Sequence, residues 1–250
     1  MSGNYDEKIY WEMINRQKEI LNKKEQSNLK NSTIAVIGCG GIGGAAIEML
    51  TRMGVSHIKI VDKDKFDITN INRQLMSSLD SVGREKTEVT KEKIHSINPL
   101  VNVETFNIEL NKDNVRRILK DSKIIVDALD NLESRIITSR CALELDIPFV
   151  HGAIHGTMGQ ITTFTKKTPT YEETFKLPSY GKDLNPEVLN KLKKITRSVP
   201  PVIGPIPNIV GCIQSFEVIK MLIKRGTVIT APDILVFDLM KKNPFSIVKF

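Results

Sequence analysis

The chain is poor in aromatic residues and in cysteine, and it lacks an obvious membrane segment. Aromatic residues make up 6% of its 250 residues, with a single tryptophan. The cysteines are too far apart in the sequence to indicate a disulfide framework or a paired-cysteine metal site, and we expect all of them to be small buried side chains: Cys39, Cys141 and Cys212. Residues 1–30 show no basic-then-apolar leader, and no apolar stretch approaches the roughly 18 residues needed to cross a bilayer. We therefore expect a cytoplasmic protein without a membrane segment.

The balance of charge is positive. The 36 Lys and Arg residues outnumber the 29 Asp and Glu residues, which gives a formal net charge of +7. Such an excess suits nucleotide phosphates, nucleic acid or an acidic protein partner. The basic residues are not interleaved with aromatic residues as in nucleic-acid platforms, so we do not expect a nucleic-acid ligand. One tighter basic group is either a solvated helix face or a surface for an acidic partner: Lys191, Lys193, Lys194 and Arg197.

Length and composition predict a single domain, because 250 residues with 40% apolar content can enclose a sizeable core. We expect a helical arm over 1–30 and a core over 31–165. A long, polar crossover loop is expected over 166–200, since ordinary connections span only about 4–6 residues. Residues 201–250 are expected to form a C-terminal helix and strands.

Within the core, apolar patterns alternate between the strand and the helix period. The expected strands are 33–37, 57–61, 101–108, 124–127 and 149–151, and the expected helices are 42–53, 85–97, 112–119 and 134–145. This order predicts an α/β fold of the Rossmann-like, doubly wound kind, with a mainly parallel sheet and helices on both faces. After residue 159, three short strand-like segments and one helix predict antiparallel additions: 160–165, 208–224, 234–237 and 247–250.

A glycine-rich turn follows the first expected strand and opens the next helix. Its glycines permit a tight turn and allow phosphate to approach backbone N–H groups: Gly38, Gly40, Gly41 and Gly43. Asp62 ends the second strand about two dozen residues later, where a carboxylate accepts hydrogen bonds from ribose hydroxyls. Together they predict an adenine nucleotide, and on these two features alone a nicotinamide-dependent dehydrogenase is the favoured class. A structural glycine turn with a surface aspartate is the remaining alternative.

Polar residues after Asp62 favour ATP instead. Asn70, Arg73 and Gln74 bring two amides and a guanidinium into one turn, for which a dehydrogenase has no use. Arg73 offers a planar donor fork for phosphate oxygens, and Lys86 adds a point charge at the start of the next helix. Lys86 alone would be interpreted as a solvated lysine. Beside Arg73, it predicts a site for a nucleotide that loses pyrophosphate.

Acidic residues follow the fourth expected strand, at the sheet edge where doubly wound folds bind ligands. Asp130 is the candidate magnesium ligand, because magnesium commonly binds one carboxylate together with phosphate oxygens and waters. Asp127, inside the apolar run, is expected to be a cap or a hydrogen-bonded structural carboxylate. Arg135 has two open roles, either binding a substrate carboxylate or pairing with a carboxylate of its own helix end, Glu144 or Asp146.

Two histidines flank a strand end, His151 and His155. Two histidines without a third ligand are a weak metal signal. We expect hydrogen-bonded loop histidines, with contact to substrate as the alternative.

In the order and spacing of these motifs the chain resembles the ThiF/MoeB family, relatives of the ubiquitin-activating enzymes that adenylylate ThiS- or MoaD-like sulfur-carrier proteins. Besides the motifs above, the resemblance rests on Asn15-Arg16-Gln17, Asp130-Asn131, the stretch 152–160, the segment 201–211 and Phe237-Asp238. Only the loop 166–199 lies outside it. The resemblance implies adenylylation of the C-terminal Gly-Gly carboxylate of a small ubiquitin-like carrier, with ATP and Mg2+ as cofactors.

The same resemblance implies roles for single residues. The nucleotide-binding set comprises Gly38, Gly40, Gly41, Gly43, Asp62, Asn70, Arg73, Gln74, Lys86 and Asn131, and the catalytic set comprises Arg16, Arg73, Lys86 and Asp130. In the family, the arginine at the position of Arg16 reaches across a two-fold interface, which implies a homodimer with shared sites. The carrier's tail is expected to pass beneath the long loop. No general base is needed, because the attacking carboxylate is already ionised.

The chain departs from the family pattern where many members carry cysteine pairs for a structural zinc. Thr170-Tyr171-Glu172-Glu173 occupies the place of the first pair, so no structural zinc is expected. The loop also has no cysteine that could join the carrier through sulfur, so the reaction is expected to stop at the adenylate.

Three other functions stay open at this stage. The first is an NAD(P)-dependent oxidoreductase, which would rest on the glycine turn and Asp62 alone. The second is a family member acting on transfer RNA, which the positive charge permits. The third is an inactive relative that binds a carrier as a scaffold.

Overall fold

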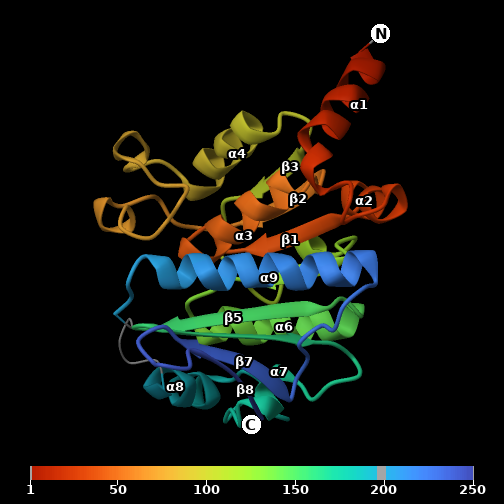
Figure 1. The fold of residues 1–250 in the computed structure, drawn as a ribbon. Coiled ribbons are helices and arrows are strands. Elements are labelled where there is room, and N and C mark those ends of the chain that lie inside the picture. Colours follow the sequence, from red (N-terminus) through yellow and green to blue (C-terminus); the bar gives the residue numbers. More distant parts are fainter. Residues whose placement is uncertain (1, 196–200, 250) are drawn as a thin grey trace.

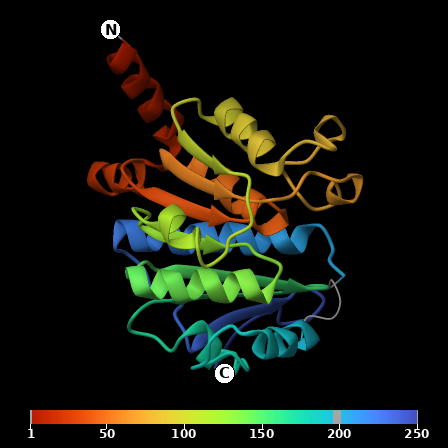
Figure 2. The same ribbon diagram turned by 180° about the vertical axis from the view of Figure 1, so that it is seen from behind.

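The computed structural model describes residues 2–195 and 201–249, with side chains from residue 7 onward. Helices cover both faces of one sheet (Figures 1 and 2). The sheet has eight strands in the order β3-β2-β1-β4-β5-β6-β7-β8. The strand order reverses between β1 and β4, which is the topological switch point of a doubly wound fold. The predicted α/β class is therefore confirmed.

Parallel strands form the first part of the sheet and antiparallel strands the second. The parallel strands are β1 (Thr33–Ile37), β2 (His57–Val61), β3 (Asn102–Phe106), β4 (Ile124–Asp127) and β5 (Phe149–His155). The antiparallel strands are β6 (Met158–Phe164), β7 (Asp233–Asp238) and β8 (Phe245–Lys249). In β1 the residues Ile34–Ile37 are all buried, as expected for a central parallel strand covered on both faces. The predicted antiparallel additions are confirmed.

Two groups of helices enclose two apolar clusters, one on each face of the sheet. The face towards the viewer in Figure 1 carries α2 (Lys23–Lys30), α3 (Gly41–Arg52), α4 (Lys86–Ile97) and α9 (Pro205–Ile223). The opposite face, seen in Figure 2, carries α5 (Val115–Leu119), α6 (Leu132–Leu145), α7 (Tyr171–Thr174) and α8 (Pro186–Ile195). Their apolar residues meet the alternating faces of the same strands, for example Ile34 and Val36 on one side and Ala35 and Ile37 on the other.

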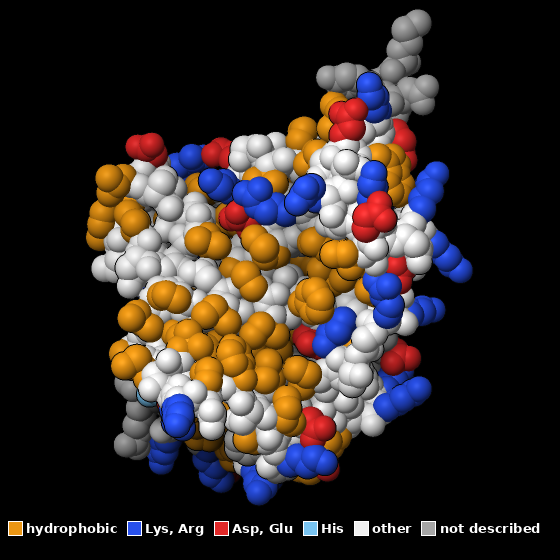
Figure 3. All heavy atoms as spheres, in the orientation of Figure 1, with side chains coloured by type: hydrophobic (Ala, Val, Ile, Leu, Met, Phe, Trp, Pro, Cys, Tyr) orange, Lys and Arg blue, Asp and Glu red, His pale blue; other side chains and the backbone are white. Residues whose placement is uncertain are grey.

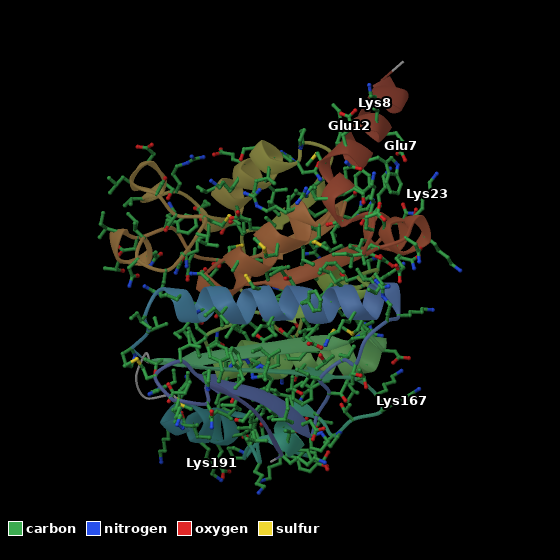
Figure 4. The ribbon with its side chains drawn as sticks, viewed as in Figure 1. Glu7, Lys8, Glu12, Lys23, Lys167 and Lys191 are labelled. Atoms are coloured by element: carbon green, nitrogen blue, oxygen red, sulfur yellow. The ribbon has the colours of Figure 1, made fainter. Side chains whose placement is uncertain are left out.

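The N-terminal arm is helical, as predicted. It consists of α1 (Ser2–Met13), the 3-10 turn η1 (Asn15–Gln17) and α2. A polar network joins it to the end of α3: Gln17 Nε2 donates to Met53 O at 3.1 Å, and Tyr10 Oη donates to Gly54 O at 2.8 Å. The labelled side chain of Lys8 projects outward from α1 (Figure 4), whereas Glu7 pairs with Lys30 of α2. The arm is therefore fixed at its base.

Helix α9 corrects the expectation that no apolar stretch is long enough to span a bilayer. It has 19 residues and a mean hydropathy of 1.4, which meet the requirement for a span by length and composition. It packs against α3 and against β5 and β6, with Val210, Val218 and Gln214 buried, so it serves as a core helix. Cys212 on α9 is exposed, and the expectation of burial was wrong for this cysteine, whereas Cys39 and Cys141 are buried.

The hairpin of β5 and β6 is longer than predicted, because its glycines do not interrupt the strands. Gly152 pairs with Ile161, and Gly159 pairs with Ile154. A Cβ on Gly152 would lie 2.7 Å from a side-chain carbon of Val210 on α9, and one on Gly159 would lie 2.6 Å from Val210 and 2.5 Å from the ring of Phe237 on β7. Close packing on α9 therefore requires glycine at both positions, and the expected strand end at residue 151 was wrong.

The crossover segment 166–200 is not a loop throughout. It contains α7 and α8, and a capping box closes the start of α7, in which Glu173 N donates to Thr170 Oγ1 at 3.1 Å. Arg140 on α6 holds α7 through two 2.7 Å bonds to the Glu172 carboxylate. Residues 196–200, including Arg197 of the predicted basic group, lie outside the described residues. Lys191 on α8 pairs with Glu187 at 2.6 Å and points away from the core (Figure 4).

Candidate functional site

A cavity of about 260 Å3 lies at the carboxyl ends of the parallel strands, next to the switch point. Its wall combines the glycine turn after β1, the residues after β2, the start of α4, the turn after β4 and the start of α9. Ten predicted site residues line it: Gly38, Gly40, Gly41, Asp62, Arg73, Gln74, Lys86, Asp130, Asn131 and Arg135. Three others do not line it, Gly43, Asn70 and Arg16. Residues from distant parts of the sequence thus meet where doubly wound folds bind nucleotides.

The glycine turn is built by close backbone contacts. Gly38 has a φ of 102°, a conformation that favours glycine, and its N–H donates to Val61 O at 2.8 Å. A Cβ on Gly43 would lie 1.8 Å from Gly38 O, so Gly43 shapes the turn without reaching the cavity. A Cβ on Gly41 would lie 2.9 Å from Pro207, at the start of α9. The turn therefore leaves backbone N–H groups accessible at the start of α3, where a helix favours anions.

Asp62 is held in place by the glycine turn. Its Oδ2 accepts the N–H of Cys39 at 2.7 Å, and its Oδ1 accepts the N–H of Asp64 at 2.9 Å. Burial raises the pKa of this carboxyl, while the nearby Lys86 ammonium and the two N–H donors act in the opposite direction. The side chain is thus oriented before any ligand arrives, with lone pairs left for ribose hydroxyls.

Two cations line the cavity near the turn. Lys86 is 8% exposed, and its Nζ lies 3.4 Å from Asp64 Oδ2. Arg73 donates from Nη1 to Thr69 O at 2.8 Å and to Asn72 Oδ1 at 2.9 Å. The hydrogen bonds that Arg73 makes with other described residues use only Nη1, so Nε and Nη2 carry donors that can serve phosphate oxygens. The solvated-lysine alternative for Lys86 does not fit its burial.

The two amides of the same turn differ in position. Gln74 is buried, lines the cavity, and its Oε1 has no hydrogen-bond partner among the described residues. Asn70 lies outside the cavity wall, and its Oδ1 accepts the N–H of Asp67 at 3.1 Å as a cap of the turn Ile68–Asn70. Asn70 therefore shapes the turn that carries Arg73 and Gln74.

Asp130 and Asn131 sit at the mouth of the cavity after β4. Asp130 is exposed, and Asn131 caps α6 by accepting the N–H of Ser134 at 2.8 Å. Within the described residues no three His, Cys, Asp or Glu side chains gather as a metal site. A magnesium ion that arrives with a nucleotide brings its own phosphate ligands, so a single exposed carboxylate is sufficient for it.

Arg135 pairs with Asp127. This confirms the expectation that Asp127 is a hydrogen-bonded structural carboxylate. Asp127 is fully buried, and its Oδ2 accepts Arg135 Nε at 2.8 Å. The alternative pairing of Arg135 was wrong, because Glu144 pairs with Arg116 and Asp146 pairs with Lys166. Arg135 also lines the cavity, so binding of a substrate carboxylate stays a prediction.

The remaining candidates lie apart from the cavity. Arg16 is exposed on η1, beside the amino ends of the strands, whereas the cavity lies at their carboxyl ends. His155 is exposed at the end of β5, and His151 is fully buried in the same strand, bonded to Asp127 at 2.7 Å. The two histidines thus share no site, and His151 is a strand residue, not the loop residue that was expected.

The sequence reasoning missed two wall residues with opposite charges. Lys63 Nζ lies 2.8 Å from Glu109 Oε1 across the ends of β2 and β3, and both line the cavity. The alternating charges of Asp62-Lys63-Asp64-Lys65 directly after a buried strand were the signal for such a polar rim.

Known proteins with similar sequences are adenylyltransferases and activating enzymes. The chain is 34% identical over 202 residues to the SAMP-activating enzyme E1 of Haloferax volcanii, covering 80% of this chain and 71% of the relative. It is 32% identical over 203 residues to the molybdopterin-synthase adenylyltransferase of Haemophilus influenzae, covering 80% and 79%. It is 35% identical over 206 residues to a probable molybdopterin-synthase adenylyltransferase of Porphyra purpurea, of whose length it covers 52%, about half.

Solved structures share the fold. PaaA superposes with a TM-score of 0.78 at 19% identity, covering 96% of this chain and 82% of the other. E. coli MccB with ATP superposes with a TM-score of 0.75 at 23% identity, covering 90% and 65%. The model of the ThiF family matches residues 14–250, and the chain therefore belongs to the ThiF family.

Proposed function

We propose that the chain uses ATP to adenylylate the C-terminal carboxylate of a small ubiquitin-like sulfur-carrier protein that ends in Gly-Gly, releasing pyrophosphate. The main observation that supports this proposal is that Asp62, Arg73 and Lys86 line one cavity together with the glycine turn. A ribose acceptor, two cations and exposed backbone N–H groups together match the parts of a nucleoside triphosphate. Relatives named sulfur carrier protein adenylyltransferase and molybdopterin-synthase adenylyltransferase support the reaction class.

Each side chain has a separate task in this reaction. Asp62 accepts the ribose hydroxyls, and Lys86 and Arg73 bind phosphate oxygens. The carrier carboxylate attacks the α-phosphorus in line, the bond to the bridging oxygen of the β-phosphate breaks, and pyrophosphate leaves with the electron pair. No general base is required, because the carboxylate is ionised at neutral pH. The protein positions the two reactants. Its cations stabilise the negative charge that develops on the oxygens of the α-phosphorus in the transition state.

Asp130 is proposed to hold Mg2+ at the mouth of the cavity. It fits this role because it is an exposed carboxylate with no salt bridge among the described residues, beside the wall that holds Lys86. A Mg2+ ion held there by Asp130 would supply positive charge against the phosphates. Asn131 keeps the turn in place by capping α6. No zinc is proposed.

The carrier's tail is proposed to enter along Ala153, Ile154 and Val202, on the wall that faces the antiparallel part of the sheet. A backbone bridge joins Gly156 to Val202, so the chain just after the crossover segment is attached to the hairpin at this point. The polar part of the cavity, with Asp62, Arg73 and Lys86, lies beyond this bridge. Two branched apolar side chains, Ile154 and Val202, narrow this path beside Ala153, so it suits a chain end without side chains, which is why a Gly-Gly end is proposed.

A homodimer is proposed as the active form, with Arg16 acting in the partner's cavity. Figure 3 shows a broad apolar area over α9 and the antiparallel strands. The exposed large apolar side chains on these elements and on the turn after β7 include Met158, Phe216, Leu239, Met240, Phe245 and Ile247. Apolar areas of this extent mark protein interfaces. A two-fold axis in front of α9, vertical in Figure 1, would exchange left and right, and so bring the partner's η1 to the carboxyl ends of the strands. The cytoplasm is the proposed compartment.

Pyrophosphate exchange into ATP tests the proposal. The chain should exchange labelled pyrophosphate into ATP when Mg2+ and its carrier are present, and a carrier lacking the terminal glycine should not support exchange. The carrier is obtained by testing small Gly-Gly-ending proteins encoded by the same organism. Stoichiometric NADH binding without ATP binding would contradict the proposal in favour of an oxidoreductase, and exchange stimulated only by transfer RNA would change its substrate.

A further inference from the structure

A buried polar network lies directly behind the cavity wall. Asp127 Oδ2 accepts Arg135 Nε at 2.8 Å and His151 Nδ1 at 2.7 Å, while its Oδ1 accepts the N–H of Leu129 at 3.0 Å. Arg135 Nη2 donates to Leu129 O, and lies 3.5 Å from Gly152 O. One carboxylate and one guanidinium therefore clamp Leu129, the residue next to Asp130, from both its N–H and its carbonyl.

His151 completes this network as a neutral ring. Its Nε2 lies 3.2 Å from Gln160 Nε2, so it accepts a hydrogen bond from that amide while Nδ1 donates to Asp127. Burial lowers the pKa of His151, and the Arg135 guanidinium acts in the same direction, which keeps the ring neutral. The neutral tautomer uses both ring nitrogens. Buried charges need such additional donors, because an incompletely bonded buried ion pair is costly.

The crossover segment reaches the same network from the other side. The ring of Tyr171 lies 5.2 Å from the ring of His151, and Tyr171 also interacts with the Arg135 guanidinium. Tyr171 belongs to α7, which Arg140 fastens to α6 through Glu172. Arg135 and Arg140 are on the same helix, so α6 joins the cavity wall to the start of the crossover segment.

We propose that His151 and Tyr171 are positioning residues: His151 holds Asp127 and Tyr171 holds Arg135, and the pair of Asp127 and Arg135 thereby fixes the turn that carries Asp130 at the nucleotide cavity. The crossover segment would then shape the ATP side of the site as well as the side that the carrier enters. This inference rests on the proposed function for its kinetic consequence, but the clamped Leu129 can be observed independently.

The test compares variants that keep or remove one donor. His151→Leu removes the bond to Asp127, and His151→Asn replaces Nδ1 with an amide donor at a similar reach. We expect His151→Leu to raise the Kd for ATP and the KM for ATP about tenfold, with the KM for the carrier changed less than twofold. His151→Asn should recover most of the loss. Tyr171→Phe, which keeps the ring, should show a smaller shift in the same direction.

Phe164→Leu is the matched control, because its ring packs on Tyr171 and His151 but forms no hydrogen bond in the network. It should lower the Tm by a similar amount and leave the KM for ATP unchanged. Amide hydrogen exchange of Leu129, measured without nucleotide, should be faster in His151→Leu and normal in His151→Asn.

Three results would overturn the inference. These are equal behaviour of the two His151 variants, an equal loss of ATP affinity in Phe164→Leu, and unchanged Leu129 exchange in His151→Leu. If wild-type protein bound no ATP while Leu129 exchange still followed His151, the proposed function would fail and the positioning of the turn would stand.

Discussion

Lys86 Nζ lies 3.4 Å from Asp64 Oδ2, at the long end of the range for a charged pair, and the lysine is buried while the aspartate is half exposed. The pair is therefore weak, because its carboxylate remains solvated. A cation held loosely at the edge of an anion-binding turn can move to a phosphate without losing a strong partner. Asp64 is thus interpreted as the resting partner of Lys86.

Replacement of this lysine should reduce catalysis strongly. Lys86→Met keeps the length of the stem but removes a cation that binds phosphate oxygens, so kcat/KM for pyrophosphate exchange should fall about 100-fold. Lys93→Met, on the exposed face of the same helix, is the control and should change the rate less than about twofold. Asp64→Asn should leave the rate within about threefold of wild type. Equal losses in Lys86→Met and Lys93→Met would contradict the role of Lys86.

Asp62 offers a test of the nucleotide half alone. Asp62→Ala removes both the ribose acceptor and the bond to the Cys39 N–H, and should weaken ATP binding about tenfold or more in calorimetry. Asp62→Asn keeps one acceptor oxygen and should lose less of the affinity for ATP. Asp67→Asn alters an exposed cap of the neighbouring turn and serves as the control. Affinity for the carrier measured without ATP should stay the same in all three, and a parallel loss would point to unfolding of the loop.

The architecture of the core could be predicted because each strand is a short apolar run that ends at a polar residue. The run Thr33–Ile37 followed by glycines, and the run His57–Val61 followed by Asp62, fixed both the parallel order and the edge where ligands bind. Cavity residues could be predicted for the same reason, since side chains just after parallel strands gather at one sheet edge.

Other features depend on contacts that a local pattern does not contain. Gly152 and Gly159 suggested a strand end, but they are required by close packing on α9, which lies some fifty residues further along the chain. The partner of Arg135 was sought on its own helix, whereas Asp127 is reached through the turn after β4. The role proposed for Arg16 requires a second chain, whose position cannot be derived from the sequence of one chain.

Stability should depend on pH through His151. The pKa of its folded form is below the ordinary value of 6.5, because burial disfavours the charged ring. As the pH falls below about 6.5, His151 takes up a proton in the unfolded chain but not in the folded chain. The free energy of unfolding therefore decreases with falling pH until the pKa of the folded form is reached. The loss is at most about 1.4 kcal/mol per pH unit for this one proton.

Urea unfolding at several pH values measures this effect. In the wild type, the free energy of unfolding should decrease as the pH falls below about 6.5. This decrease should be smaller in His151→Asn, because the variant has no titrating ring at this position. The charged or titratable groups that face His151 are Asp127, Arg135 and Tyr171. Burial raises the pKa of Asp127, but Arg135 and His151 together bring it below its ordinary value of 3.8. The stability that Asp127 contributes is therefore lost only below about pH 3.8, outside the range in which His151 acts. An identical slope in both proteins would exclude His151 as the source.

The shared site of the proposed homodimer makes a quantitative prediction. Arg16→Ala and Lys86→Met should each retain only about one hundredth of the wild-type activity alone, because every site then lacks a cation. When both variants are coexpressed in equal amounts, half of the dimers are mixed, and in each of these one site combines an intact Lys86 with the partner's intact Arg16. Pyrophosphate exchange should therefore return to about a quarter of the wild-type rate per chain. Recovery requires exchange of subunits during assembly, so mixing the two purified proteins is the control. If coexpression restores nothing while purification through a different affinity tag on each variant recovers mixed dimers, Arg16 does not act in the partner's cavity.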